Sequence, residues 1–332
     1  MLSARKQTIV EEKEDQPRGG LDVMWWRRRW FAACLMLLGS AATASTASAQ
    51  EVVGKRMFSD TLVISEPFVE DEVSPSFLRL LRPRTGDTPR GWVTEFDLEI
   101  KKRLTPSFEV SIATGWLRLD PTTGASRSAA ENLEIGLKYE VWRSEAREAI
   151  AALALRWDVG GTSGSPDRIV GEESFDTLRP SVLVGKGFGD LPEPLRLLRP
   201  FAVTGSLGAI VPTKGSEEHP DRIQWGGVIE YSLPYLTSFV SDVRLPGFVA
   251  RVVPLVEVDF QTAVDRGAAG QTTGTINVGG VWIGRAVQLG VEMVIPANDR
   301  TSPALGVRAF MRIDLDALSP RLGRPVFGAR RE

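Results

Sequence analysis

The sequence is poor in the residues that most often bind metals or serve as catalytic bases. It contains one cysteine, Cys34, and one histidine, His219. Transition-metal sites draw mainly on these two residue types, and a hydrolytic barrel enzyme needs a histidine base beside a serine nucleophile. His219 stands in the polar stretch 217–221, which is typical of a loop and offers no neighbouring nucleophile. We therefore expect no enzyme, no metal site and no cofactor.

Long apolar runs and an excess of one charge are also missing. No window after residue 49 is apolar enough for a membrane-spanning helix, which needs about 20 apolar residues, and helical periodicity is rare. The chain has 40 Lys and Arg against 42 Asp and Glu, a net charge of −2. A nucleic-acid interface concentrates positive charge on one surface, so we expect no nucleic-acid partner. A hydrophobic content of 42% argues against a disordered chain.

The first 49 residues contain the three parts of a secretory signal peptide, preceded by a polar extension. A basic cluster at 25–29 is followed by a short apolar run at 31–38 and a small-residue stretch that ends at Ala49. We predict export through the general secretory route, with Met24 as the initiator and cleavage after Ala49. Because Cys34 leaves with this segment, the exported chain has no disulfide, and a closed hydrogen-bonded barrel is one alternative source of stability.

The rest of the chain alternates between apolar and polar residues, which is the period of a β-strand. Between 92 and 101, apolar residues such as Phe96 and Leu98 alternate with charged ones, and after a turn at 105–107 the alternation resumes at 108–116. The same pattern predicts further strands at 133–141, 149–159, 176–188, 200–212, 222–233, 249–264, 272–284, 286–296 and 304–315.

The connections between these strands alternate in length, and this indicates a topology. Short turns at 104–107, 144–148 and 284–286 alternate with longer polar connections. Outer-membrane barrels have short periplasmic turns, longer external loops and, in bacteria, an even number of strands. Eleven strands are evident, so we expect a twelfth within 58–69 and a first external loop at 70–91.

The predicted fold class is therefore all-β, an antiparallel up-and-down transmembrane β-barrel of about 12 strands. No stretch of the chain resembles a linker, so we predict one barrel domain at 50–318 in the bacterial outer membrane and a periplasmic C-terminal tail at 319–332. Two connections on the predicted periplasmic side, 189–199 and 234–247, are longer than such turns usually are. We expect short interfacial pieces within them.

Tryptophan placement favours a membrane over a soluble sandwich or lipocalin-like barrel, whose apolar face would point inward. Aromatic rings at both membrane interfaces are typical of membrane barrels. Trp142 lies on the polar face of its strand, so we interpret it as a lumen or packing residue. Five others lie near strand ends on the apolar face and are predicted interfacial aromatics: Trp92, Trp116, Trp157, Trp225 and Trp282.

The opposite, charged face would line the lumen of the barrel. Both signs are present, so cross-lumen salt bridges are one interpretation and a role in selectivity is the other, because an unpaired charge in a confined lumen is costly. The predicted lumen-lining residues are Glu95, Asp97, Glu99, Lys101, Glu134, Lys138, Glu140, Arg156, Asp158, Glu230, Glu257, Asp259, Glu292, Arg308, Arg312 and Asp314.

Three segments in the first third of the mature chain resemble one group of proteins. They are the acidic stretch 62–72, the strand 95–99 and the sequence 102–106. The chain resembles bacterial outer-membrane β-barrel transporter-like proteins of the MetA-pathway of phenol degradation type. The resemblance implies a barrel that passes small, often aromatic or apolar, compounds, and it carries over no catalytic residue. The chain departs from other outer-membrane barrels because it ends on charged residues rather than on a strand with a terminal aromatic.

Three functions follow as hypotheses. The first is a passive channel or uptake barrel for small solutes in the outer membrane, with lipid and a small-molecule solute as partners. The second is a plugged structural barrel. The third is a soluble periplasmic β-protein that binds a lipid-like ligand. The sequence names neither the solute nor the oligomeric state.

Overall fold

The computed structural model describes residues 52–83, 90–162, 175–214, 219–301, 304–319 and 321–328. The predicted export segment at 1–49 lies outside these ranges, as do parts of several long connections. Within the described residues, no helix has the length and apolar character needed to cross a membrane.

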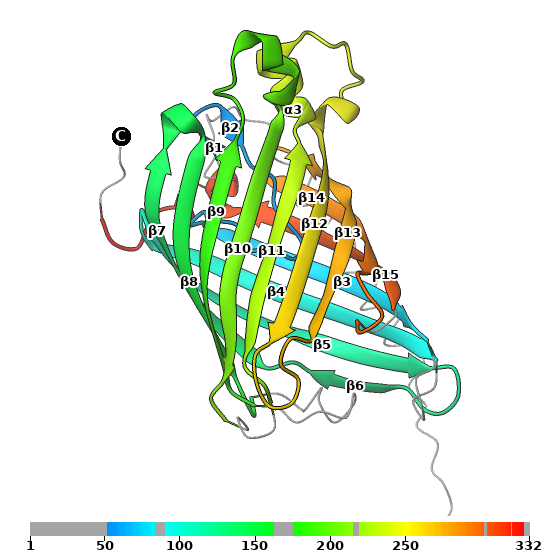
Figure 1. Cartoon of the computed structure of the whole chain (residues 1–332). Helices are drawn as coiled ribbons and strands as arrows, with labels where there is room; N and C mark the ends of the chain where they lie inside the picture. Colours follow the sequence, from blue (N-terminus) through cyan, green and yellow to red (C-terminus); the bar gives the residue numbers. More distant parts are fainter. Residues whose placement is uncertain are drawn as a thin grey trace, which may run out of the picture. The chain divides into compact units, whose positions relative to one another are not determined.

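Twelve antiparallel strands form one closed sheet (Figure 1). Neighbours in the chain are neighbours in the sheet, and the ring closes where β3 pairs with β15. One further short strand, β6 (Arg127–Ala130), pairs with β5 alone. The predicted all-β antiparallel barrel of about twelve strands is confirmed. Its strands are β3 (Glu72–Arg82), β4 (Gly91–Thr105), β5 (Phe108–Pro121), β7 (Leu133–Ser144), β8 (Ala149–Val159), β9 (Thr177–Gly187), β10 (Phe201–Pro212), β11 (Arg222–Tyr231), β12 (Val252–Ala263), β13 (Thr272–Ile283), β14 (Val287–Pro296) and β15 (Leu305–Asp314).

The two ends of the barrel differ. At one, which we call the loop end, the strands are joined through the longer polar connections. At the other, the turn end, three connections are short, and all the described helices lie there (Figure 1). These helices are η1 (Glu145–Arg147), η2 (Glu193–Leu198), α3 (Leu233–Tyr235), η3 (Leu236–Val240), η4 (Val249–Arg251) and α4 (Leu315–Leu318).

The outward face of the barrel is apolar on every strand. The alternation seen in the sequence places large hydrophobic side chains outward and polar ones inward, because successive side chains of a strand point to opposite faces. We call these outward residues the apolar belt. One exposed member from each strand, in chain order, is Phe77, Phe96, Ile112, Tyr139, Leu153, Val182, Leu207, Ile229, Val256, Val278, Val291 and Val307.

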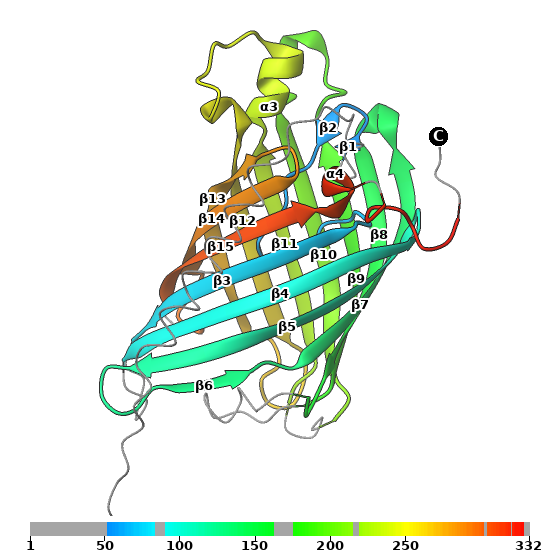
Figure 2. The ribbon, with the colours of Figure 1, turned by 180° about the vertical axis from the view of Figure 1, so that it is seen from behind.

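The segment that precedes β3 lies inside the barrel, which corrects one prediction. Residues 52–71, the interior segment, begin with a hairpin of β1 (Val52–Val53) and β2 (Arg56–Met57) and continue without regular structure. Figure 2 shows this blue chain behind the wall of strands. Ile64 packs against inward residues of β11, β12 and β13.

The prediction of a strand within 58–69 was therefore wrong, as was that of a loop throughout 70–91. The twelfth strand is β3, which pairs with both β15 and β4 and leaves no gap in the ring for another. The apolar residues 62–64, which precede β3, lie inside the lumen and are not part of a sheet.

The interpretation of Trp142 as a lumen or packing residue was also wrong. The register between β7 and β8 shifts between Glu140 and Trp142, which marks a β-bulge. A bulge inserts one residue and reverses the parity of those that follow. As a result Val141 and Trp142 are both exposed, Trp142 by 49%.

Candidate functional site

The interior segment crosses a lumen whose wall supplies hydrogen-bond acceptors. The carboxylate of Glu257, on β12, accepts the backbone N–H groups of Leu62 at 2.7 Å, Val63 at 2.9 Å and Ile64 at 3.4 Å. These amides have no strand partner, and a buried backbone N–H without an acceptor is costly. Glu257 is fully buried. Its carboxylate therefore supplies the hydrogen-bond acceptors that a neighbouring strand would otherwise provide to residues 62–64.

Other wall residues bind the segment in the same way. Glu109 accepts the N–H of Glu70 at 2.7 Å, and Lys138 donates to the carbonyl of Phe68 at 2.7 Å. Glu230 accepts the backbone N–H of Ser59 at 3.1 Å and Arg308 donates to the carbonyl of Leu62 at 3.2 Å. The backbone of the segment is thus bound by charged side chains of five different strands.

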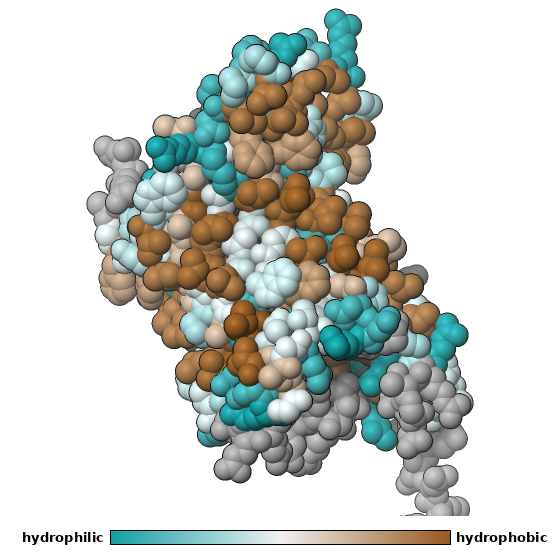
Figure 3. All heavy atoms as spheres, viewed as in Figure 1, coloured by the Kyte–Doolittle hydropathy of each residue, from teal (hydrophilic) through white to brown (hydrophobic). Residues whose placement is uncertain are grey.

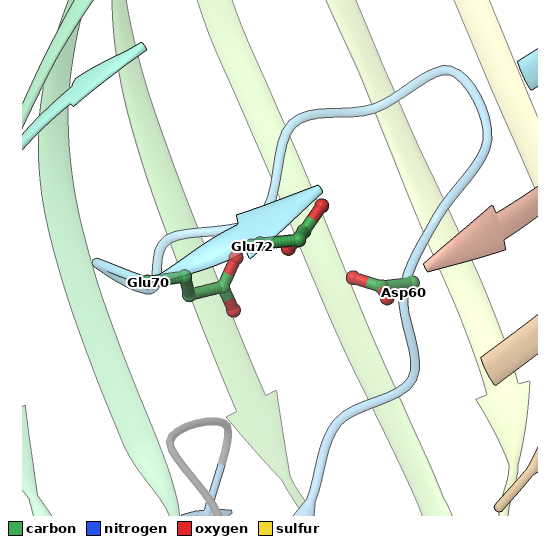
Figure 4. Close-up of side chains that lie close together, drawn as sticks. All are labelled: Asp60, Glu70 and Glu72. Atoms are coloured by element: carbon green, nitrogen blue, oxygen red, sulfur yellow. The ribbon is translucent and has the colours of Figure 1, made fainter. Parts of the chain in front are cut away.

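Two acidic side chains of the segment and Glu72, the first residue of β3, converge on one arginine of the wall. Figure 4 shows Asp60, Glu70 and Glu72, three buried carboxylates close enough together to hold a metal ion. Arg312 Nη2 lies 2.7 Å from one oxygen each of Glu70 and Glu72, and Arg312 Nη1 pairs with Asp60. The single guanidinium therefore offsets one of the three formal negative charges of the cluster. Lys101 adds a second cation, 3.4 Å from Glu72 and 3.5 Å from Glu70.

The hairpin of the interior segment is bound at the turn end through Arg56. Its guanidinium donates to the carbonyls of Pro200 at 2.8 Å and Phe201 at 3.0 Å, and lies 4.1 Å from the centre of the Tyr235 ring. The Tyr235 hydroxyl donates to Glu148 at 3.0 Å. Burial and then the negative charge of Glu148 raise the pKa of Tyr235 to about 12. The hydroxyl thus keeps its proton at any physiological pH.

A cavity of about 620 Å³ occupies the lumen between the interior segment and the loop end. Glu131 and Asn132, in the connection before β7, are part of its lining, so the cavity reaches that end. The described residues that line it include three basic side chains, Lys101, Arg156 and Arg179, and nine acidic ones. The acidic residues are Asp60, Glu66, Glu72, Glu95, Asp97, Glu99, Glu131, Glu134 and Asp158.

The basic residues of the cavity are already paired. Arg156 lies 2.9 Å from Glu134 and 3.4 Å from Glu99, and Arg179 lies 2.6 Å from Asp158. By formal count the described lining therefore has more acidic than basic groups, nine against three.

Glu95, Asp97 and Glu131 form the most acidic part of the lining. Glu131 lies outside the strands, and burial together with the charges of Asp97 and Glu95 raises its pKa to about 8. Like charges confined in one site disfavour ionisation. A positive solute at this position would relieve that repulsion.

The structure places each predicted lumen residue, and most fall into two groups. Seven line the cavity: Glu95, Asp97, Glu99, Lys101, Glu134, Arg156 and Asp158. Five contact the interior segment: Lys138, Glu230, Glu257, Arg308 and Arg312.

The remaining four have separate environments. Glu292 is buried beside Glu257, and Asp259 accepts from Gln224 at 3.1 Å. Glu140 pairs with Arg143 at 2.7 Å. Asp314 caps α4 by accepting the N–H of Asp316 at 2.9 Å, at the turn end rather than in the cavity.

Four of the predicted interfacial tryptophans, Trp92, Trp116, Trp157 and Trp225, are exposed on the outward face towards the loop end. Trp282 lies at the turn end and is half-buried. His219 stacks on Phe175 with 3.8 Å between ring centroids and is not among the described residues that line the cavity.

Sequence reasoning missed the acidic residues that the interior segment and the first residue of β3 bring into the lumen. Asp60, Glu66, Glu70 and Glu72 were not candidates, although four acids within 66–72 are an unusual density. Arg179 and Glu131 were missed as well. Their strand or loop positions carry no pattern that distinguishes them from solvated surface residues.

No protein-family model matches the chain, and no curated protein matches it. Three solved structures are similar in fold. The KdgM porin is 12% identical, with 73% of this chain and 99% of that chain covered and a TM-score of 0.44. LpxR from Salmonella typhimurium is 12% identical, with 74% and 100% covered and a TM-score of 0.41. An outer membrane channel from Pseudomonas putida F1 is 11% identical, with 76% and 98% covered and a TM-score of 0.49. At these values the comparisons carry no conclusion about function, and the resemblance to the phenol-degradation group stays a prediction.

Proposed function

We propose that the chain is a bacterial outer-membrane β-barrel that acts as a passive channel for small hydrophilic solutes and favours cations. The observation that carries the proposal is that the same strands have an apolar face on the outside of the barrel and a polar face on the inside. Large apolar side chains cover the outward face of all twelve strands, while the lumen contains an acidic cavity. An apolar surface of this extent is rare on soluble monomers and suits contact with lipid.

The lining of the cavity decides which solutes fit. Twelve of the 25 described lining residues are charged, nine of them acidic, against seven apolar ones. A field of one sign in a low-dielectric cleft concentrates ions of the opposite sign. The resemblance implied aromatic or apolar solutes, but a lumen for those would bury apolar side chains against them. We therefore favour small polar cations.

A second candidate is a structural barrel that does not conduct. The observation that favours it is the interior segment, whose backbone and side chains are bound on several sides of the lumen. A twelve-stranded barrel lies between the filled eight-stranded kind and the open porins, so one such segment can occlude it.

Two measurements test these functions. A folded outer-membrane barrel should resist denaturation and migrate anomalously on gels until heated, whereas recovery in the soluble periplasm would contradict any membrane role. In planar bilayers with a KCl gradient, the channel should conduct with a reversal potential that indicates preference for K⁺. A folded, inserted barrel that never conducts would support the structural candidate instead.

A further inference from the structure

The two longest connections at the turn end form a block of short helices with an exposed apolar surface. The block consists of η2, α3, η3 and η4, with η2 packed against η3 and α3 against η4. In Figure 3 the hydrophobic surface over this part continues down onto the strands. Its large exposed side chains are Leu195, Leu197, Leu198, Phe239, Phe248 and Val249.

The apolar surface of the helical block faces the same way as the apolar belt. The Phe248 ring stacks on the Trp282 ring, with 6.1 Å between centroids and an interplanar angle of 16°. Trp282 has the parity of the exposed Val278, while the adjacent Val281 is fully buried towards the lumen. Phe248 therefore lies over the outward face of β13, and 69% of its surface is still exposed.

The opposite side of the block is already occupied. Tyr235 and Leu236 are buried at the end of the barrel, and Tyr235 contacts both Glu148 and Arg56. The block is therefore bound to the barrel on its inner side. Other side chains of the block, such as Leu197, exposed by 60%, are left largely uncovered by the described residues.

Water is a poor environment for this surface. Burying one large aliphatic or aromatic side chain contributes about 1.5–3 kcal/mol. Six such side chains of the block are exposed, although Phe239 lies partly against Tyr235 and Lys55. Exposed arginines accompany them: Arg251 lies 6.0 Å from the Trp282 ring and Arg244 is also exposed, while Arg196 lies 3.6 Å from Glu193. Short amphipathic pieces with this mixture lie at the boundary between lipid headgroups and acyl chains, where arginine reaches phosphates.

We propose that the helical block is a membrane-contacting surface that lies in the phospholipid leaflet at the turn end and extends the apolar belt beyond the strands on the β9–β13 side. This inference rests on the proposed membrane location. Lipid is the expected occupant because the surface is continuous with the belt at Phe248 and Trp282 and carries the exposed arginines Arg244 and Arg251 beside it.

Site-directed fluorescence quenching tests the proposal. In a Cys34→Ser background, Phe248→Cys and Leu197→Cys are labelled with bimane and reconstituted into vesicles of phosphatidylethanolamine and phosphatidylglycerol with doxyl-labelled phosphatidylcholine. Val291→Cys in the belt is the control for lipid contact, and Lys214→Cys at the loop end is the control for water. Should Phe248→Cys fail to give a heat-modifiable barrel, Val249→Cys at the neighbouring exposed position replaces it.

We expect the doxyl lipid to quench both block positions within about twofold of Val291→Cys, with little quenching by aqueous iodide. Strong iodide quenching at both positions, with Val291→Cys still quenched by lipid, would overturn the inference while leaving the proposed function intact. Protection from both quenchers would indicate contact with a second copy of the chain and would also overturn it. If Val291→Cys itself escapes lipid quenching, the proposed function fails.

Discussion

The carboxylate of Glu257, in the middle of β12, accepts the backbone N–H of Leu62 at 2.7 Å. The two residues are 195 positions apart in the chain, and the contact joins the wall of the barrel to the tip of the interior segment. The two oxygens of a carboxyl group can accept several N–H donors at once. An inward carboxylate that would otherwise be costly in a confined lumen thus becomes part of the anchor.

Removal of the Glu257 carboxylate should loosen the interior segment. Glu257→Ala leaves two or more buried N–H groups without an acceptor, at a cost of about 1–3 kcal/mol each. We expect larger or more frequent conductance steps in planar bilayers and faster proteolysis within 58–69. Glu257→Gln keeps one acceptor oxygen and should give an intermediate effect. Unchanged conductance and protection in Glu257→Ala would show that this contact does not restrain the segment.

Arg312 should be important for stability because it is shared by Asp60, Glu70 and Glu72. Arg312→Gln leaves buried carboxylates with less compensating charge, and breaking such a buried pair costs about 3–5 kcal/mol. We expect a lower urea midpoint for the loss of heat-modifiable migration in detergent. Arg308→Gln, which loses one hydrogen bond to the segment, should cost less. Equal midpoints for the two variants would contradict this role of Arg312.

The apolar belt predicts a strong penalty for a charge on the outward face. Val291 is an exposed belt residue within β14, where it pairs with Gly280 and Ala309. Val291→Lys should destabilise the barrel in vesicles by about 2–4 kcal/mol if the residue faces the middle of a bilayer. Thr123→Lys, in an exposed loop-end connection, is the matched control. A similar small effect of both substitutions on urea unfolding would mean that Val291 faces water.

The acidic lining predicts the ion preference of the channel. Glu95→Gln combined with Asp97→Asn removes two negative charges from the cavity. We expect the ratio of K⁺ to Cl⁻ permeability, measured from reversal potentials, to fall. Asp242→Asn, an exposed residue of the turn end, should leave the ratio unchanged. If the double variant conducts with the ratio of the unmodified chain, the cavity does not set selectivity.

The raised pKa of Glu131 predicts that the preference of the channel for K⁺ over Cl⁻ depends on pH. The pKa of Glu131 is raised to about 8 by burial and by Asp97 and Glu95. The side chain is therefore mostly neutral at pH 6 and mostly charged above pH 9, so the preference for K⁺ should increase as pH rises through about 8. Glu131→Gln should abolish this increase and match the low-pH value. An identical pH profile in both proteins would assign the titration to another group.

Much of the barrel could be predicted from local pattern, and the exceptions have specific causes. Alternation in 92–101 or 133–141 reports which side chains share a face, because a strand has a period of two residues. The bulge at Glu140 and Trp142 breaks this rule by one inserted residue, and nothing in the local sequence marks it. The run Leu62, Val63 and Ile64 has the composition of a strand, so its local pattern does not distinguish a place in the wall from a place in the lumen.

What the sequence by itself determined was the class of the fold, an approximate strand count and, away from the bulge at Glu140 and Trp142, the face on which most strand side chains lie. These depend on the periodicity of neighbouring residues. Only the tertiary structure decided that β3 completes the ring, that 52–71 fills part of the lumen, and that Asp60 meets Arg312 across it. Closure of a barrel and contacts across its interior join residues far apart in the chain. They depend on how many strands are already paired and how much space remains inside.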